Sequence, residues 1–96
     1  MNSLQEKEIE QKLRKSVKAM GGICPKFVSP SYDGMPDRLI LLSNGKIAFA
    51  ELKAKGKKPR PIQVRRIEQL RKLGFKVYVI DDVKQIGGVL DEIRAT

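Results

Sequence analysis

Two apolar runs separated by an Asn-Gly pair constrain the fold of this chain more than any other feature. The runs are Leu39–Leu42 and Ile47–Ala50, and the Asn-Gly pair occupies positions 44 and 45. Such a pair between apolar segments is the strongest short-range signal for a tight hairpin turn. We therefore predict an antiparallel hairpin with strands at about Asp37–Ser43 and Lys46–Lys53.

Charged side chains lie at the open end of this predicted hairpin. Asp37 begins the first strand, and Glu51 and Lys53 end the second. Side chains alternate between the two faces of a strand, so Glu51 and Lys53 share a face. Asp37 can lie beside Glu51 in an antiparallel pair. Hard divalent cations such as Mg²⁺ are held by one or two carboxylates together with phosphate oxygens. The arrangement predicts metal-dependent hydrolysis of phosphodiester bonds.

Each of these residues also has a structural interpretation. Asp37 follows a proline, and aspartate is common at turns and strand entries. Lys53 can pair with Glu51 as a plain salt bridge, which does not exclude catalysis. Glu51 has the weakest structural alternative, because a carboxylate in a central strand is seldom buried without a partner.

The charge distribution indicates a polyanionic partner. The 96 residues include 20 Lys and Arg against 11 Asp and Glu, a formal net charge of +9. Between Lys53 and Ile67 there are basic residues and no acidic one. A solvated loop that aids solubility is the alternative, but the run begins at the predicted site and so favours phosphate binding. The basic residues are Lys53, Lys55, Lys57, Lys58, Arg60, Arg65 and Arg66.

Composition excludes several other classes of function. The chain has no histidine and one cysteine, Cys24, which rules out a histidine-based dyad and argues against structural zinc. No apolar run approaches the ~20 residues that span a membrane. The first residues lack the basic and apolar regions of a signal peptide, so we expect cytoplasmic residence. The length predicts a single domain, residues 1–96.

The remaining elements follow from helical and strand periodicity. A first helix is predicted from a capping box of Ser3 and Glu6 to a stop at Gly21-Gly22. Ile23–Val28 is predicted as a short strand, placed at an edge or bulge because it contains Pro25.

The second half of the chain predicts a helix, a strand and a helix. The first of these helices, Pro61–Leu73, would bury a face that includes Leu73, and Phe75–Ile80 alternates as a strand. Asp81 or Asp82 would cap a last helix with Val83 facing inward. The order is α-β-β-β-α-β-α, an α/β fold with a mixed sheet flanked by helices, since the crossover helix makes its flanking strands parallel.

These motifs together resemble a known family. The segments in question are Gly34-Met35-Pro36-Asp37-Arg38, Phe49-Ala50-Glu51-Leu52-Lys53, the basic loop and Gln63, in that order. With the Glu-rich first helix, they resemble the VRR-NUC nucleases of the PD-(D/E)XK superfamily, over about residues 6–80. The resemblance implies a restriction-endonuclease-like fold and Mg²⁺ or Mn²⁺ as cofactor.

The resemblance also implies roles for individual residues. Asp37, Glu51 and the carbonyl of Leu52 would bind the metal, and Lys53 would position the attacking water. Gln63 would hold Lys53 or a phosphate.

The family pattern also calls for a glutamate on the first helix. Glu6 suits its spacing, with Glu10 and Glu8 as alternatives. Lys26 could reach the same cleft or be surface charge, and Tyr32 could stack on a base or pack its loop.

Small stand-alone members of the family look like homodimers that cut four-way junctions, often from phages. We therefore expect a structure-selective DNA endonuclease acting on branched or four-way (Holliday) junction DNA. A dimer would use the first helix and the edge strand Ile23–Val28. The alternatives are a non-catalytic nucleic-acid-binding module and a subunit of a restriction or repair assembly that is inactive alone.

Overall fold

The computed structural model describes residues 4–96, built around a three-stranded sheet in the order β1-β2-β3. β1 (Arg38–Leu42) pairs antiparallel with β2 (Lys46–Leu52), which pairs parallel with β3 (Val77–Ile80). Between β1 and β2, Asn44 and Gly45 have φ values of 67° and 70°. A type I′ turn requires positive φ at both positions, which explains the Asn-Gly pair. The predicted hairpin is confirmed.

The segment predicted as the strand Ile23–Val28 lies along the outer side of β1 without forming a regular strand. It makes isolated antiparallel bridges at Ile23 and Lys26. The Leu39 N–H donates to the Pro25 carbonyl at 3.0 Å, but Pro25 has no N–H with which to extend the ladder. The predicted element order is consistent with this arrangement, and the first predicted strand is a bridged edge.

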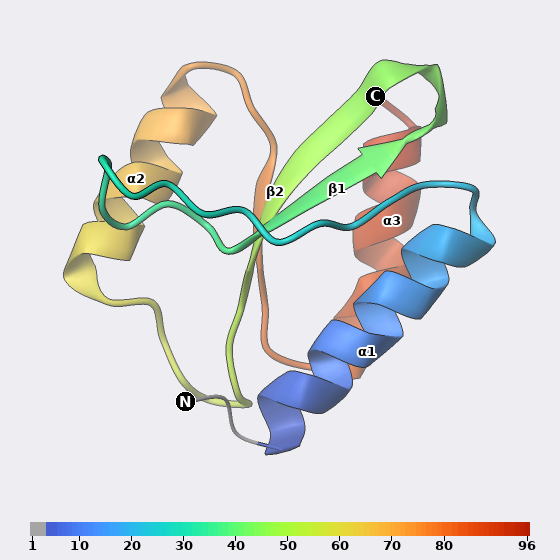
Figure 1. Cartoon of the computed structure of the whole chain (residues 1–96), viewed down its shortest axis with the longest axis horizontal. Coiled ribbons are helices and arrows are strands. Elements are labelled where there is room, and N and C mark those ends of the chain that lie inside the picture. The colour runs from blue at the N-terminus through green and yellow to red at the C-terminus, as the bar shows by residue number, and fades with distance from the viewer. Residues whose placement is uncertain (1–3) are drawn as a thin grey trace.

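Helices cover both faces of the sheet (Figure 1). α1 (Leu4–Ala19) and α3 (Ile86–Arg94) pack on one face, and α2 (Pro61–Lys72) lies on the other. Alternation along β2 sorts the side chains. Ala48, Ala50 and Leu52 join the core with α1 and α3, while the odd positions face α2. None of the helices within residues 4–96 is long and apolar enough to cross a membrane.

Details at the helix ends differ from the sequence predictions. Ser3, the expected first cap, lies outside the described residues. α2 ends at Lys72, so Leu73 follows the helix and is exposed instead of buried. Asp82 acts as a cap as predicted, accepting from the Lys84 N–H at 2.9 Å, but it begins the short 3-10 helix η2 (Val83–Gln85). Val83 is consequently exposed.

Gly34 fixes the approach of the loop before β1 to the first turn of α2. Its φ is +84°, and a Cβ there would lie 2.7 Å from the Ile62 carbonyl oxygen and 2.9 Å from Ile62 Cγ1. Only glycine combines this backbone conformation with this close approach. Gly34 therefore places the loop that carries Asp37 directly against α2.

We expect Gly34→Ala to destabilise the protein by roughly 3 kcal/mol, because strain at positive φ adds to the clash with Ile62. Gly56→Ala is the matched control, since Gly56 has φ +79° and nothing within 4 Å of the added Cβ. The control should lose only about 1 kcal/mol. Urea denaturation measures both, and equal losses would show that the contact with Ile62 contributes nothing.

Candidate active site

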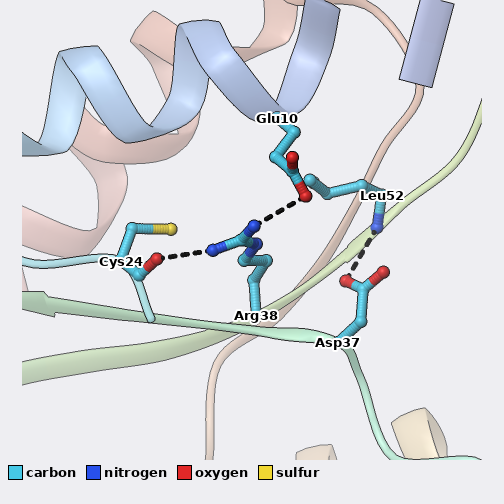
Figure 2. A network of polar contacts seen from close by, with 5 residues as sticks. All are labelled: Glu10, Cys24, Asp37, Arg38 and Leu52. Atoms are coloured by element: carbon cyan, nitrogen blue, oxygen red, sulfur yellow. Dashed lines mark hydrogen bonds and ion pairs between the residues drawn. The ribbon is translucent and has the colours of Figure 1, made fainter. Parts of the chain in front are cut away.

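The site begins at a gap in the hydrogen-bond ladder between β1 and β2. Arg38 pairs with Ala50, and continuing this register by two residues sets Pro36 opposite Leu52. Pro36 has no N–H, so β1 offers no ladder donor to the Leu52 carbonyl. The other backbone polar group of Leu52, its N–H, donates to Asp37 Oδ1 at 3.4 Å (Figure 2). The proline thus accounts for an acceptor oxygen beside the Asp37 carboxylate.

Glu51 projects from β2 toward α2 and is only 3% exposed. Its Oε2 accepts a hydrogen bond from Gln63 Nε2 at 2.8 Å and lies 3.4 Å from Lys53 Nζ. Its Oε1 is buried without a hydrogen-bond partner among residues 4–96. A buried carboxylate oxygen left unpaired is costly, so Glu51 has an open position for a cation.

Gln63 hydrogen-bonds to Glu51 and not to Lys53, which was one of its two predicted partners. Its side chain is 7% exposed, and its contact with a phosphate stays a prediction. Gln63 Oε1 accepts from the Arg60 N–H at 2.8 Å at the start of α2. This bond orients the side chain so that its amide nitrogen donates to Glu51.

The pKa values of Asp37 and Glu51 are both raised, which indicates that negative charge at the site is not fully compensated. Burial and the nearby Glu51 charge raise the pKa of Asp37 to about 6. Burial also raises the pKa of Glu51, against the opposing effect of Lys53 and the hydrogen bond from Gln63. One lysine at 3.4 Å therefore does not fully compensate the two acids. A bound cation would relieve both penalties.

This donor set fits a hard divalent cation. Within residues 4–96, no three or more His, Cys, Asp and Glu side chains cluster closely enough to hold a metal ion by themselves. Mg²⁺, however, is commonly bound by only one or two carboxylates, with water and substrate phosphates completing its shell. Asp37, Glu51 and the Leu52 carbonyl meet that requirement.

The three glutamates of α1 have different surroundings. The charge of Glu6 raises the pKa of Asp37, so Glu6 lies toward the site. Glu10 pairs with Arg38 at 2.6 Å, and that hydrogen bond lowers its pKa. Glu8 is exposed and borders a separate pocket with Lys55. Of these three glutamates, Glu6 is therefore the one whose charge raises the pKa of Asp37, while Glu10 is engaged by Arg38.

Arg38 was missed as a partner in the sequence analysis. It is 5% exposed and also donates to the Cys24 carbonyl at 2.8 Å (Figure 2). Arg38 shares its strand face with Ile40 and Leu42, and this alternation already places a charge in the core. A buried guanidinium needs a carboxylate, and Glu10 supplies it.

The predicted nucleic-acid-binding residues divide into exposed and engaged groups. Lys57, Lys58, Arg60 and Arg65 are exposed, as is Lys55, whose ammonium lies 3.6 Å from an Asp82 oxygen. All of them border the loop and the first turns of α2. Their contact with DNA stays a prediction.

Arg66 and Lys26 are placed differently. The Arg66 guanidinium lies 3.8 Å from the Tyr32 ring centroid, and its Nε donates to the Asp33 carbonyl at 2.7 Å. Tyr32 donates to Gln69 Oε1 at 3.0 Å, so both side chains attach the loop to α2. Lys26 is exposed, and its charge acts on Glu10, on the α1 side of the sheet.

Comparisons with known proteins find relatives that match over most of the chain. No family model matches the chain. It is 49% identical over 81 residues to "Putative nuclease p44" of Acyrthosiphon pisum secondary endosymbiont phage 1, covering 84% of this chain and 87% of the relative. A solved structure described as "VRR_NUC domain" superposes with a TM-score of 0.85 at 31% identity, covering 93% of this chain and 97% of the other.

A second solved structure, a "VRR_NUC domain protein", has a TM-score of 0.73 at 19% identity and covers 97% of this chain and 90% of its own. At that identity the likeness concerns the fold alone.

The raised pKa of Asp37 predicts that Asp37→Asn stabilises the protein in EDTA. The pKa rises from 3.8 to about 6 on folding, so the folded state binds the proton more tightly. The ionised carboxylate therefore lowers stability increasingly between pH 4 and pH 6, and fully above. Two pKa units correspond to roughly 3 kcal/mol at pH 8, and the gain should vanish near pH 4.

Thermal unfolding of wild type and Asp37→Asn at pH 8 and pH 4 measures this effect. Asp33→Asn, in the exposed loop, is the control and should change neither melting temperature. A melting temperature for Asp37→Asn that does not exceed that of wild type at pH 8 would contradict the electrostatic assignment.

Proposed function

The chain belongs to the VRR_NUC family, and from this premise we propose that it is a Mg²⁺- or Mn²⁺-dependent DNA endonuclease that cuts branched or four-way junction DNA. The observation that carries the proposal is the unpaired, buried Oε1 of Glu51 beside the Asp37 carboxylate. A protein that only binds nucleic acid has no use for two acids at a surface meant for phosphate. The nuclease name of the phage relative agrees with hydrolysis.

Each residue of the site has a role in this reaction. Asp37, Glu51 and the Leu52 carbonyl would hold the cation, which supplies positive charge to activate water and to stabilise the charge that develops on phosphate. Gln63 keeps Glu51 oriented. Lys53 lies beside Glu51 with an exposed edge, where it can hold the attacking water or a phosphate oxygen.

Glu6 and the basic loop complete the proposed site. The charge of Glu6 already reaches Asp37, which suits a ligand of the water shell around the cation. The exposed cations of the loop, Lys55, Lys57, Lys58 and Arg60, would bind the phosphates on either side of the cut bond.

Substrate and assembly follow from the kind of contacts that the site offers. The basic loop would contact phosphates, which carry no base-sequence information, so DNA shape is the feature that these contacts can recognise. Cutting two strands of a junction needs two sites, and a two-fold homodimer supplies them. Because the named relative is a phage protein, we expect the enzyme to act in the cytoplasm of a bacterial host.

Cleavage of a DNA panel tests the proposed activity. Linear, nicked, flap, splayed and four-way DNA are incubated with Mg²⁺, Mn²⁺ or EDTA, and we expect cutting of the branched DNAs with either metal and none in EDTA. Asp37→Asn and Glu51→Gln should cut at least 100-fold more slowly, although Asp37→Asn is the more stable protein. Lys53→Met should lose turnover far more than metal affinity.

Undiminished cleavage by Asp37→Asn or Glu51→Gln would refute the assignment of the site. Normal turnover by Lys53→Met would limit Lys53 to a salt bridge with Glu51.

The basic loop predicts a salt-dependent contribution to binding. Replacing Lys55, Lys57, Lys58 and Arg60 with Gln should weaken binding to linear duplex and flatten its salt dependence. Each phosphate contact adds roughly −0.9 to the slope of log K against log salt concentration. Fluorescence anisotropy in EDTA from 50 to 300 mM salt measures the slope. An unchanged slope would show that the loop does not contact the backbone.

A further inference from the structure

A second basic stretch without acidic residues extends from Gln11 to Tyr32. Its basic members are Lys12, Arg14, Lys15, Lys18 and Lys26. The stretch includes the second half of α1 and the segment that bridges to β1. None of its side chains takes part in the proposed active site, so its charge calls for a separate explanation.

Three of these cations border one groove. The groove has a volume of about 750 Å³ and lies between α1 and residues 21–25. Arg14, Lys15 and Lys18 form its α1 side, and Ile23 and Pro25 belong to the opposite side. All three cations are exposed, and among residues 4–96 none of them forms an ion pair. We call this feature the α1 groove.

Helix stability explains only part of this charge. Cations in the last turn of a helix interact favourably with its dipole, but the effect fades within that turn. Of the three, only Lys18 lies in the last turn of α1. Arg14 and Lys15 stand further back, so the helix dipole does not account for them.

The α1 groove lies by the second half of α1, whereas the basic loop lies near the first turns of that helix, where Lys55 and Glu8 border one pocket. α1 packs on the face opposite α2, whose first turns continue the basic loop (Figure 1). The molecule measures only 32 × 32 × 22 Å. DNA has a persistence length of about 50 nm, and bending 20–30 base pairs by 40–90° costs on the order of 1–6 kcal/mol. A duplex that lies along α2 would therefore have to bend to follow the surface to the groove beside α1, on the other face.

We propose that the α1 groove binds the phosphate backbone of a second arm of a branched DNA whose first arm lies at the active site. The inference rests on the proposed function and gives it a physical basis, because a branch point brings two duplex arms to one small protein from different directions. The three cations form no ion pair within residues 4–96 and suit a polyanion, and the proposal deepens the proposed function by naming the surface that would hold the second arm.

A second copy of this chain is the competing occupant. A two-fold dimer through the groove would bring the same patch of both copies together. The residues that line the groove include no acidic side chain, so a second copy that buried the groove against the same patch would bring mainly basic side chains together. Like charges opposed across an interface are unfavourable. A second copy is therefore the less favourable occupant of the groove, and a dimer through the first helix stays a prediction.

The test compares two triple variants of equal charge. Arg14→Gln/Lys15→Gln/Lys18→Gln removes the cations of the groove, and glutamine keeps good helix propensity. The control, Lys72→Gln/Lys84→Gln/Arg94→Gln, removes three exposed cations elsewhere on the surface. Binding to a four-way junction and to a linear duplex with the same arm sequence is measured by anisotropy in EDTA. Cleavage with Mg²⁺ and light scattering at micromolar concentration complete the comparison.

We expect the groove variant to bind the junction about tenfold or more weaker, with a salt slope smaller by about 2 to 3, and to bind linear duplex within twofold of wild type. The control should affect both DNAs equally. An equal loss on both DNAs, or no loss on either, would overturn the proposal. So would a groove variant whose molecular mass changes, because the occupant would then be a second copy.

Failure of the proposed function gives a different pattern. A wild-type protein that prefers the junction through the groove in EDTA but cuts no DNA with Mg²⁺ or Mn²⁺ would refute the nuclease activity and leave the groove assignment standing. A wild-type protein that binds neither DNA would overturn both.

Discussion

The arrangement of this protein depends on one buried carboxylate in the central strand of its sheet. Glu51 is 3% exposed, and an ionised group at such a position is tolerated only when it is paired and hydrogen-bonded. α2 supplies the hydrogen bond through Gln63, and Lys53 supplies a charge two residues along the same strand face. The close approach of α2 to the loop at Gly34 brings these elements together. Glu51 Oε1 nevertheless has no hydrogen-bond partner within residues 4–96, and it is the oxygen that can bind a cation.

The Pro-Asp and Glu-Leu-Lys motifs lie opposite each other at the end of the β1–β2 pair, where their backbone groups interact. Pro36 has no N–H to donate to the Leu52 carbonyl. The Leu52 N–H donates to the side chain of Asp37. Alternation along β2 then directs Leu52 into the core while Glu51 and Lys53 face α2. The same few residues thus end a strand pair, anchor the sheet in the core and gather two carboxylates at one point.

The periodicity of the sequence predicted which side chains share a face of a strand, but it could not predict which hydrogen-bond partner each side chain has. The Asn-Gly turn and the alternation of the hairpin were sufficient to place Asp37, Glu51 and Lys53 together. The partner of the Gln63 amide nitrogen depends on how the side chain is oriented by the hydrogen bond from the Arg60 N–H to its oxygen, and on how α2 packs against β2. The sequence predicted that the segment with Pro25 lies at a sheet edge. The segment forms only isolated bridges with β1, because Pro25 has no N–H to donate.

α1 carries acidic side chains in its first half, toward the active site, and basic side chains in its second half, beside the α1 groove. Glu6, Glu10, Arg14 and Lys18 follow one another at intervals of four residues, so they lie along one side of the helix, two acids followed by two bases. Glu10 is held by the buried Arg38 at 2.6 Å, and that pair fixes the rotation of the helix about its axis. With Glu10 fixed, the preceding turn directs Glu6 toward Asp37 and the following turns direct Arg14 and Lys18 toward the α1 groove. The Arg38–Glu10 pair thus lies on α1 between Glu6, whose charge acts on Asp37, and the cations of the α1 groove.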